Sequence, residues 1–514
     1  MSNPSPTLAA FLSFIFPGAG QLYAGEPRRA IIWALPMLAF ILAVLWLLFG
    51  GQGALLGLVT APRLLGILVL NVAFFLYHVA AMLDAYQLAG RERFSGYRRS
   101  TGFAPVALAS LVALTMILHG LPAVTWGVPL YNFVASQQGR PNVIPSFNPG
   151  PTPTPSPIPS GASPTPSVTP GPSGSLSPTP SGSSGPQPSS TPRACAPIDL
   201  SGWPMADDGR VNLLLVGSDS RSDDGVSAAS IRTDSMLLMT IDIASCKAAM
   251  FSFPRNMKVA GLESRYPPWL RISLENGTDY QGFLFGLWRD AASSPGVYRG
   301  SEGVGAECQA QFDCERGWRA LTVAIQNMAG VQVDAVVSVN LKGFVDVVNN
   351  LPGGGLWIDI PAPLYDEEYF DSNQQKMLID FEKGCQFLNG EESLAYARSR
   401  HQDSDYQRAR RQQYVIQQVR KQLDPIALLP QIPALLGVAQ ANLFMTIDDT
   451  DIPFLAQVAS RIDADRIYRY DFAPARLARL ESMQGMADKV NNIFSEPEPN
   501  PTTRPDQEPC PPPD

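Results

Sequence analysis

The sequence predicts an extracytoplasmic α/β domain, with a mixed central sheet flanked by helices, preceded by an α-helical transmembrane region and a disordered Pro/Ser/Thr linker. Three observations support this architecture. Apolar runs of membrane-spanning length lie before residue 127, and a proline-rich stretch without charged residues follows them. Beyond residue 200, apolar segments of strand length alternate with helical patterns. The 514 residues therefore divide into parts of different character.

Residues 1–127 are the predicted multi-span transmembrane region. They hold seven arginines, no lysine and three acidic residues. Three apolar runs, Ala30 to Phe49, Leu64 to Leu83 and Phe103 to about Trp126, approach the roughly 20 residues that cross a bilayer. Arg28 and Arg29 precede the first run and four further arginines lie between the second and third. The positive-inside rule places these loops in the cytoplasm and everything after residue 127 outside the cell.

An interrupted apolar segment, "FLSFIFPGAGQLYAGEPRRA" at residues 11–30, precedes these runs. It resembles the Pro-Gly-x-Gly-Gln-x-Tyr-x-Gly signature of small bacterial membrane hairpins of the TM2 type. Two alternatives remain open for it, a fourth span with an outside N-terminus or a re-entrant helix.

Residues 128–200 are predicted to be a disordered linker, and residues 481–514 a disordered, acidic, proline-rich tail. From Pro141 to Pro192, 17 of 52 positions are proline and none is charged. Such a segment buries too little apolar surface to offset its ordering entropy. At about 3 Å per residue, its upper reach is on the order of 150 Å. This predicts a spacer that carries the next domain away from the membrane into the cell wall.

All six cysteines follow the last predicted span. An even number on the outer side, with no Cys-x-x-Cys, favours disulfides over metal ligation. Cys308 and Cys314, close together in a Gly-rich insertion, are the most plausible pair, and the other pairings remain open.

Residues 201–480 are the predicted catalytic domain. Apolar runs predict strands at 211–220, 235–243, 247–255, 334–340 and 356–360. Helical patterns lie at 319–330, 341–351, 389–397 and 405–423. The alternation of the two predicts a mixed sheet with helices packed on it.

One edge of this sheet collects charged residues. If the first three strands run up, down and up, Asp219, Arg232, Asp234 and Arg255 converge where the first and third end and the second begins. Two neighbouring carboxylates repel unless a cation lies between them, and oxygen ligands suit Mg²⁺. Asp219 and Asp234 are therefore the predicted metal ligands. The alternative is that Asp219 caps a turn while Arg232 pairs with Asp234.

The stretch "YARSRHQDSDYQRARRQQY", residues 396–414, contains five arginines. A helix begins near Asn389, and if the chain extends after it, Arg398 and Arg400 lie on one face because side chains two apart do so. Guanidinium groups bind phosphate oxygens in bidentate geometry. The pair therefore suits a phosphorylated ligand.

A second face of charged and polar residues lies on the next predicted helix. Asp405, Arg408 and Gln412 follow one another at spacings of three and four and share a face, whereas Arg410 and Arg411 lie off it. Residues 128–514 carry 31 basic and 43 acidic side chains, which argues against nucleic acid as a partner. A compact polyanion with a metal, above all a pyrophosphate, fits this cluster better.

Five blocks follow one another as in the LytR-CpsA-Psr family of cell-wall glycopolymer transferases, which the region from about 210 to 425 resembles. The blocks are "NLLLVGSDSR", "RTDSMLLMTID", "FSFPRN", "GFVDVVNNLPGGGLWIDI" and "FLNGEESLAYARSRHQDSDYQRARRQQ". The last is the most specific, and their common order makes a chance match improbable.

The resemblance implies a fold with an apolar tunnel for a polyprenyl chain. It also implies transfer of a phosphorylated glycopolymer from a polyprenyl-pyrophosphate carrier to a hydroxyl of peptidoglycan or a related wall polymer. By motif, Asp219 and Asp234 resemble the Mg²⁺ ligands, with either as the proton acceptor. The implied pyrophosphate ligands are Arg255, Arg398 and Arg400, and the implied remainder of the pocket is Arg232, Asp405, Arg408 and Gln412.

The sequence also departs from the family pattern. Asn256 follows Pro254-Arg255 where the family has Asp, and an insertion rich in Gly, Ser and aromatics occupies about 262–317. These changes bear on the acceptor side and the tunnel mouth. Two other functions remain open, a polyprenyl-pyrophosphate hydrolase and a non-catalytic lipid-binding protein with a wall-anchoring or regulatory role.

Overall fold

The computed structural model describes most of the chain. The described residues are 4–49, 57–90, 103–138, 208–219, 232–258, 266–275, 277–294, 315–399, 405–423 and 425–497, with the single residues 144, 146, 147, 203 and 510.

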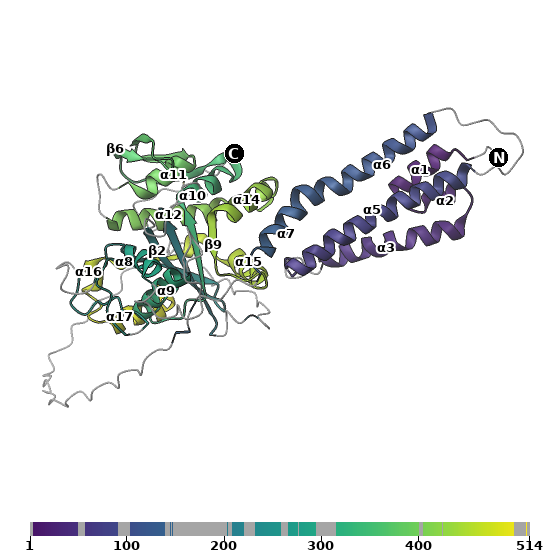
Figure 1. Ribbon diagram of the computed structural model, residues 1–514. Coiled ribbons are helices and arrows are strands. Elements are labelled where there is room, and N and C mark those ends of the chain that lie inside the picture. The colour runs from purple at the N-terminus through teal and green to yellow at the C-terminus, as the bar shows by residue number, and fades with distance from the viewer. Residues whose placement is uncertain are drawn as a thin grey trace, which may run out of the picture.

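Three helices in the N-terminal part are long and apolar enough to cross a membrane (Figure 1). They are α3 (Pro27–Phe49), α5 (Ala61–Gly90) and α6 (Phe103–Pro122), the last continued by the π-helical turn η1 (Ala123–Gly127) and α7 (Val128–Ala135). The helix thus extends past the predicted boundary at residue 127, since Pro122, Gly127 and Val128 all keep right-handed helical dihedral angles. Residues 128–135, predicted as the start of the linker, are helical.

The interrupted segment before α3 forms two short helices, α1 (Pro6–Ile15) and α2 (Ala19–Tyr23). Gly18, at φ 103°, makes the turn between them. The buried Gln21 accepts a hydrogen bond from Ser13 Oγ and donates to a carbonyl of α5. At ten residues, α1 is about 15 Å long, half of what a span needs. The structure therefore favours the re-entrant alternative.

The centre of the second part is a mixed six-stranded sheet in the order β10-β3-β2-β1-β4-β9. Its strands are β1 (Arg210–Ser218), β2 (Thr233–Asp242), β3 (Lys247–Phe253), β4 (Ala335–Asn340), β9 (Leu443–Met445) and β10 (Tyr468–Asp471). β2 runs antiparallel to β1 and β3, β4 runs parallel to β1, and β10 parallel to β3. The predicted up-down-up order of the first three strands is confirmed.

Both faces of this sheet are covered, which is why its strands read as nearly continuous apolar runs. On one face, Leu214, Met236 and Phe251 belong to a large core with three helices. These helices are α8 (Leu284–Ser293), α9 (Glu315–Ala329) and α17 (Met483–Asn491). On the other face, Leu237 and Met250 pack beneath a second helical layer. That layer comprises α10 (Leu341–Asn349), α11 (Gly390–Arg398), α12 (Asp405–Gln422) and α15 (Ile452–Arg461) (Figure 1).

Two small sheets lie beyond α11 and α12. β5 (Leu356–Ile360) pairs with β8 (Gly384–Leu388), and β6 (Leu364–Phe370) forms a hairpin with β7 (Lys376–Phe381). The strand predicted at 356–360 is present, but it does not join the central sheet. Its apolar side chains instead share a separate core with α11 and α12.

The C-terminal segment adds further helices and strands to the domain. They include α13 (Pro425–Leu428), α14 (Ile432–Asn442) and α16 (Pro474–Leu477). The tail predicted from residue 481 is wrong for 483–495, because Met486, Val490 and Ile493 are spaced as one helical face and are buried in the large core. Cys385 and Cys510 form a disulfide. The predicted pair of Cys308 and Cys314 lies outside the described residues.

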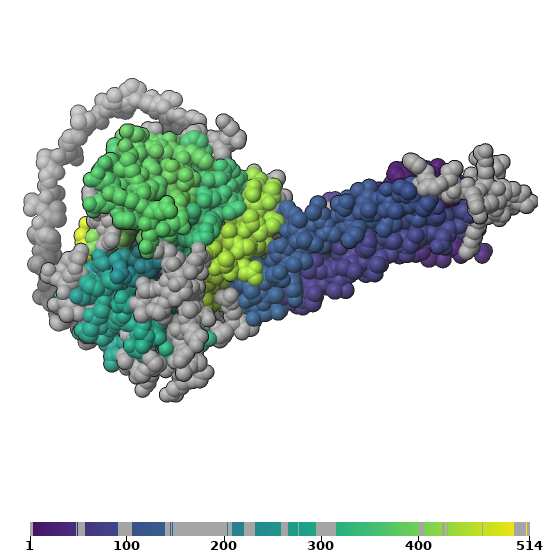
Figure 2. All heavy atoms as spheres, turned by 45° about the horizontal axis from the view of Figure 1, so that its top comes forward, coloured from purple at the N-terminus to yellow at the C-terminus, as the bar shows by residue number. Residues whose placement is uncertain are grey.

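The domain packs against one end of the three long apolar helices (Figure 2). α14 lies along α7, and Asp449 accepts a hydrogen bond from the backbone N–H of Ala61 at the start of α5. Two residues that follow α7 closely in the sequence also contact the domain. Ile144 is part of the large core, and the N–H of Phe147 donates to the side chain of Gln332. The domain therefore sits beside the membrane helices, whereas the length of the linker had predicted a domain held away from them.

Asp334 fixes β4 against β1 at the end of the sheet opposite the charged edge. Its carboxylate accepts from the N–H of Asn212 at 2.7 Å, and its own N–H donates to the carbonyl of Asn212. Burial is the main cause that raises the pKa of this carboxyl from 3.8 to about 7. At pH values between 3.8 and about 7, the Asp334 carboxyl is therefore protonated in the folded protein but ionised in the unfolded chain.

Because the folded state binds this additional proton, we expect the free energy of unfolding to rise as the pH falls from about 8 to 5. In detergent, the full chain should then melt a few degrees higher at pH 5.5 than at pH 8. Asp334→Asn keeps an acceptor oxygen without the charge, so it should melt higher than the wild type at pH 8 and lose much of the pH dependence. The exposed Asp463→Asn is the control, and an unchanged pH profile in Asp334→Asn would contradict the assignment.

Candidate pyrophosphate pocket

Three strands bring the predicted acidic and basic residues to one edge of the sheet. β1 and β3 end there and β2 begins there, because β2 is antiparallel to both. Asp219 directly follows β1 and exchanges two hydrogen bonds with Arg232, from its own N–H to the carbonyl at 3.1 Å and from the N–H of Arg232 to its carboxylate at 2.6 Å. The carboxyl group of Asp219 lies close enough to Asp234 for the two charges to interact, and the turn that the alternative prediction has Asp219 cap lies outside the described residues.

A bulge in β2 sets the direction of Asp234. Gly217 pairs with Ser235 and Ser218 pairs with Thr233, so Asp234 has no partner on β1. Thr233 faces the large core, where its hydroxyl approaches the sulfur of Met236. The extra residue turns Asp234 toward the other face, as bulges beside functional sites often do. Asp234 therefore lines the pocket together with Ser235.

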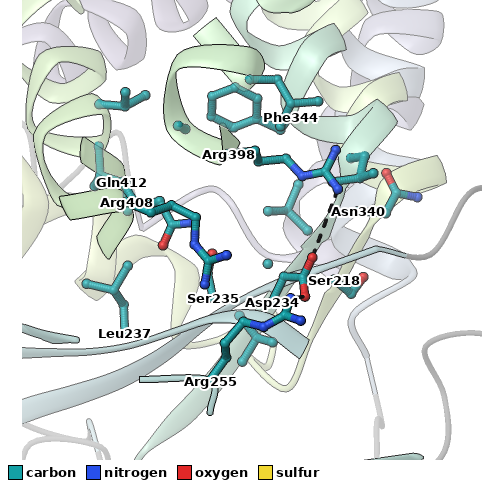
Figure 3. A pocket seen from close by; sticks show the side chains of 18 of the residues that line it. Ser218, Asp234, Ser235, Leu237, Arg255, Asn340, Phe344, Arg398, Arg408 and Gln412 are labelled. Carbon is teal, nitrogen blue, oxygen red and sulfur yellow. Dashed lines mark hydrogen bonds and ion pairs between the residues drawn. The ribbon is translucent and has the colours of Figure 1, made fainter. Parts of the chain in front are cut away.

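Two arginines meet at Asp234 (Figure 3). Arg255 donates from Nη1 to one carboxylate oxygen, and Nη2 of Arg398 lies 4.0 Å from the other. The side chains of Arg255 and Asp234 are 11 % and 19 % exposed. Asp234 therefore orients two guanidinium groups that come from different parts of the chain.

Arg255 also has unused donor capacity. Its guanidinium lies 4.8 Å from the ring centre of Phe285, and within the described part of the chain its buried Nε has no hydrogen-bond partner. A buried donor without a partner is costly. An anionic ligand at this edge is the kind of group that would satisfy it.

The arginine-rich stretch supplies the opposite wall. Asn389 and Glu392 form a capping box that begins α11, and Arg398 ends this helix. On α12, Arg408 and Gln412 point into the same pocket, with Arg408 only 6 % exposed. The predicted face of α12 therefore lines the pocket.

Three predicted site residues are either outside the pocket or not fully described by the structure. Arg232 is exposed and does not line the pocket. Asp405 begins α12, but its side chain is outside what the structure describes, and Arg400 also lies outside the described residues. Their assignments remain predictions.

The pKa of the Asp219 carboxyl is raised above its ordinary value. Burial is the largest cause and the negative charge of Asp234 adds to it, while the N–H of Arg232 acts in the opposite direction. The described residues contain no cluster of three or more Asp, Glu, His or Cys side chains suited to a metal. A metal at this edge would have two carboxylates as its protein ligands, and a cation between them would relieve their repulsion.

The β6–β7 hairpin forms a wall of the pocket that the sequence analysis did not predict. Asp366, Glu368, Tyr369 and Phe370 all line it. Arg398 lies 5.9 Å from the ring centre of Tyr369, and burial raises the pKa of Tyr369 to about 12. The signal that was available is the alternation in "LYDEEYF" and "KMLIDF" around the polar turn "DSNQQ".

The whole pocket has a volume of about 880 Å³ and extends from the charged edge into an apolar part. It lies between the sheet and the helices α10, α11 and α12. Its apolar lining comprises Leu215, Leu237, Val337, Val339, Leu341, Phe344, Leu394, Val415, Ile416 and Leu443. The pocket therefore joins a phosphate-binding type of surface to a surface suited to a hydrocarbon chain.

Arg410 and Arg411, which were predicted to lie off the pocket face of α12, contact other parts of the protein. Arg410 pairs with Asp471 at 3.2 Å. Arg411 donates from Nε to the carbonyl of Tyr396 at 2.6 Å and from Nη2 to the carbonyl of Ser399. Arg411 therefore ties α12 to the end of α11, on which Arg398 lies.

Residues 187–485 match the family model described as the LytR_cpsA_psr family. Polyisoprenyl-teichoic acid–peptidoglycan teichoic acid transferase TagT of Bacillus subtilis is 24 % identical over 269 residues, 51 % of this chain and 69 % of TagT. Biofilm regulatory protein A of Streptococcus mutans is 24 % identical over 269 residues, 52 % of this chain and 57 % of that protein. The chain thus spans little more than half the length of the latter.

A solved structure is also similar, the crystal structure of Bacillus subtilis TagV. It is 21 % identical, covers 54 % of this chain and 97 % of its own, and has a TM-score of 0.35.

The contacts of Arg411 predict a positioning role. Arg411→Ala removes two charge-assisted hydrogen bonds to the end of α11, each worth about 1.5–3 kcal/mol. Hydrogen–deuterium exchange should therefore speed up in the peptide containing residues 394–399. Arg410→Ala, on the same helix, is the matched control and should leave that peptide protected. Equal exchange in the two variants would mean that Arg411 does not hold this segment.

Proposed function

The chain belongs to the LytR-CpsA-Psr family, and we propose that it is a membrane-anchored phosphotransferase that moves a phosphorylated glycopolymer from a polyprenyl-pyrophosphate carrier to peptidoglycan or a related wall polymer. The observation that carries the proposal is the joined pocket, charged at Asp234, Arg255, Arg398 and Arg408 and apolar beyond them. A relative, TagT, is named as a transferase of this kind.

The two ends of the pocket match the two ends of such a donor. Arginines suit a pyrophosphate, because a guanidinium binds two phosphate oxygens at once. The apolar lining suits a polyprenyl chain, whose burial contributes about 0.8 kcal/mol for each CH₂ group. A ligand with only one of these ends would leave half of the pocket unused.

The proposed reaction assigns a role to each of the charged groups. An acceptor hydroxyl attacks the phosphorus that carries the glycan, and the bond from this phosphorus to the bridging oxygen breaks. Polyprenyl phosphate leaves, and a carboxylate, Asp219 or Asp234, takes the hydroxyl proton. Arg255 and Arg398 stabilise the charge that develops on the transferred and leaving phosphates, which is where most of the catalysis of phosphoryl transfer arises.

Asp219 and Asp234 are the residues that would hold Mg²⁺. The burial of Asp219 beside a second carboxylate is an arrangement that a cation stabilises, and hard oxygen ligands are those that Mg²⁺ prefers. When bound, Mg²⁺ would neutralise phosphate oxygens near the bond that breaks.

Reconstitution tests the transferase directly. The full chain in liposomes, given a polyprenyl-pyrophosphate oligosaccharide, Mg²⁺ and peptidoglycan fragments, should form a phosphodiester-linked product. Arg398→Ala should lower turnover by roughly 10²-fold or more, because it removes a donor to the developing charge. The control is Arg466→Ala, a partly exposed arginine distant in sequence from the pocket residues.

Three results would contradict the proposal. If the sugar phosphate is always transferred to water, the protein is a hydrolase. If the polyprenyl-pyrophosphate donor binds but is never turned over, only a lipid-binding role is left. Equal rates for the Arg398 and Arg466 variants would remove Arg398 from the site.

Acidification should weaken Mg²⁺ binding, and at a higher pH than an ordinary aspartate would require. Protonated Asp219 cannot serve as an anionic ligand, and its raised pKa shifts that loss upward. Calorimetric titration of the full chain with Mg²⁺ alone between pH 7.5 and 5 measures the effect. Asp219→Asn should bind weakly at every pH, and Asp463→Asn should behave as the wild type. A pH-independent affinity in the wild type would contradict this ligand assignment.

A further inference from the structure

The domain rests on the membrane helices through a small, specific contact. Asp449, 4 % exposed, accepts from the N–H of Ala61 at 2.9 Å, and Nε2 of Gln138 lies 3.4 Å from the same oxygen. A carboxylate is stabilising at a helix N-terminus, where backbone N–H groups are unpaired. Beside it, Ile452 packs against the buried cluster of Ala61, Leu64 and Val134. The contact thus joins the outer ends of α5 and α7 to the loop that begins α15.

The apolar part of the pocket extends toward this same contact. Leu215, Leu237 and Ile416 line the pocket and also belong to the cluster that includes Phe454 and Leu455 of α15. α15 begins at Ile452, which touches the membrane helices. Along β1, the distance from the charged edge increases toward Arg210, so Leu215 lies deeper than Ser218. The apolar path therefore runs from the arginines toward α15.

A second element leads to the same place. Leu443 lines the pocket directly after α14, and α14 packs along α7. In Figure 2 the yellow-green surface of this region lies against the blue surface of the membrane helices. Among the described residues, α14 and α15 thus each lie next to pocket-lining residues and next to the helical bundle.

We propose that the membrane helices are a docking base that holds the deep end of the pocket at the bilayer, so that the polyprenyl chain enters between α14 and α15 directly from the outer leaflet. The inference rests on the proposed function for the identity of the lipid. It gives the multi-span region a role beyond anchoring.

Cross-linking tests the docking without any activity measurement. Val134→Cys with Ile452→Cys, treated with a short thiol cross-linker in liposomes, should join the membrane part to the domain. A protease site placed within residues 151–190 reveals the link, because the two parts stay together after cleavage. The control pair is Val124→Cys with Ile452→Cys, in which Val124 is 67 % exposed on the helical segment just before α7. Failure of the first pair, or equal linking of both, would overturn the docking.

Photolabelling tests the lipid path. The probe is a polyprenyl phosphate with a photoreactive group at the end of its chain, held in phosphatidylglycerol-containing vesicles. The wild type should be labelled in peptides spanning 432–461. Asp449→Ala should lower this labelling about tenfold, the effect of losing one charge-assisted hydrogen bond. Asp449→Asn keeps an acceptor oxygen and should retain most of it, and Asp463→Ala should match the wild type.

The outcomes separate the inference from the proposed function. Labelling that is absent, or equal in Asp449→Ala and the wild type, overturns the entry path even if the enzyme is an active transferase. Labelling that depends on Asp449 supports the path even if no transfer to peptidoglycan occurs.

Discussion

The charged edge depends on the pairing of β1, β2 and β3 in one fixed register. A slip by one residue exchanges the two faces of a strand, and Leu237 would then lie in the helical core opposite the pocket. Within this register, the bulge at Asp234 turns a single carboxylate toward the arginines. The site therefore combines a rigid sheet, which sets position, with one local irregularity, which sets direction.

The central strands and α12 could be predicted because the local pattern of apolar and polar residues determines which kind of element each segment forms. The runs that became β1 to β4 are mostly apolar, and the face shared by Arg408 and Gln412 follows from helical spacing alone. The strand at 356–360 was predicted as a strand but not in its sheet, because its partner β8 is fixed by packing on α11 and α12. Local pattern identifies an element, and tertiary contacts decide its neighbours.

What the sequence did not predict arises from contacts distant along the chain. The β6–β7 hairpin is attached to α11 and its C-terminal end, where Ser399 donates to Asp366 at 2.7 Å and the N–H of Ser372 donates to Glu391 at 3.2 Å. Strands β9 and β10 have three and four residues, too few for a periodicity to appear. Likewise, the tail was predicted to begin at residue 481 from composition alone. The acidic residues near α17 made this segment resemble the tail, so its buried face was not recognised. The docking of Asp449 on α5 joins residues 388 positions apart and has no local signature.

The charges that line the pocket bear on why a cation belongs to the proposed reaction. Among the described lining residues, Arg255, Arg398 and Arg408 are balanced by three carboxylates, Asp234, Asp366 and Glu368. A pyrophosphate would add negative charge to a balanced, partly buried site, where uncompensated charge is costly. Arg255, Arg398 and Arg408 by themselves therefore provide direction and hydrogen bonds rather than an excess of positive charge. This favours the proposal that Mg²⁺ accompanies the donor, with Asp219 and Asp234 as its ligands, because the added cation offsets the charge that the donor brings.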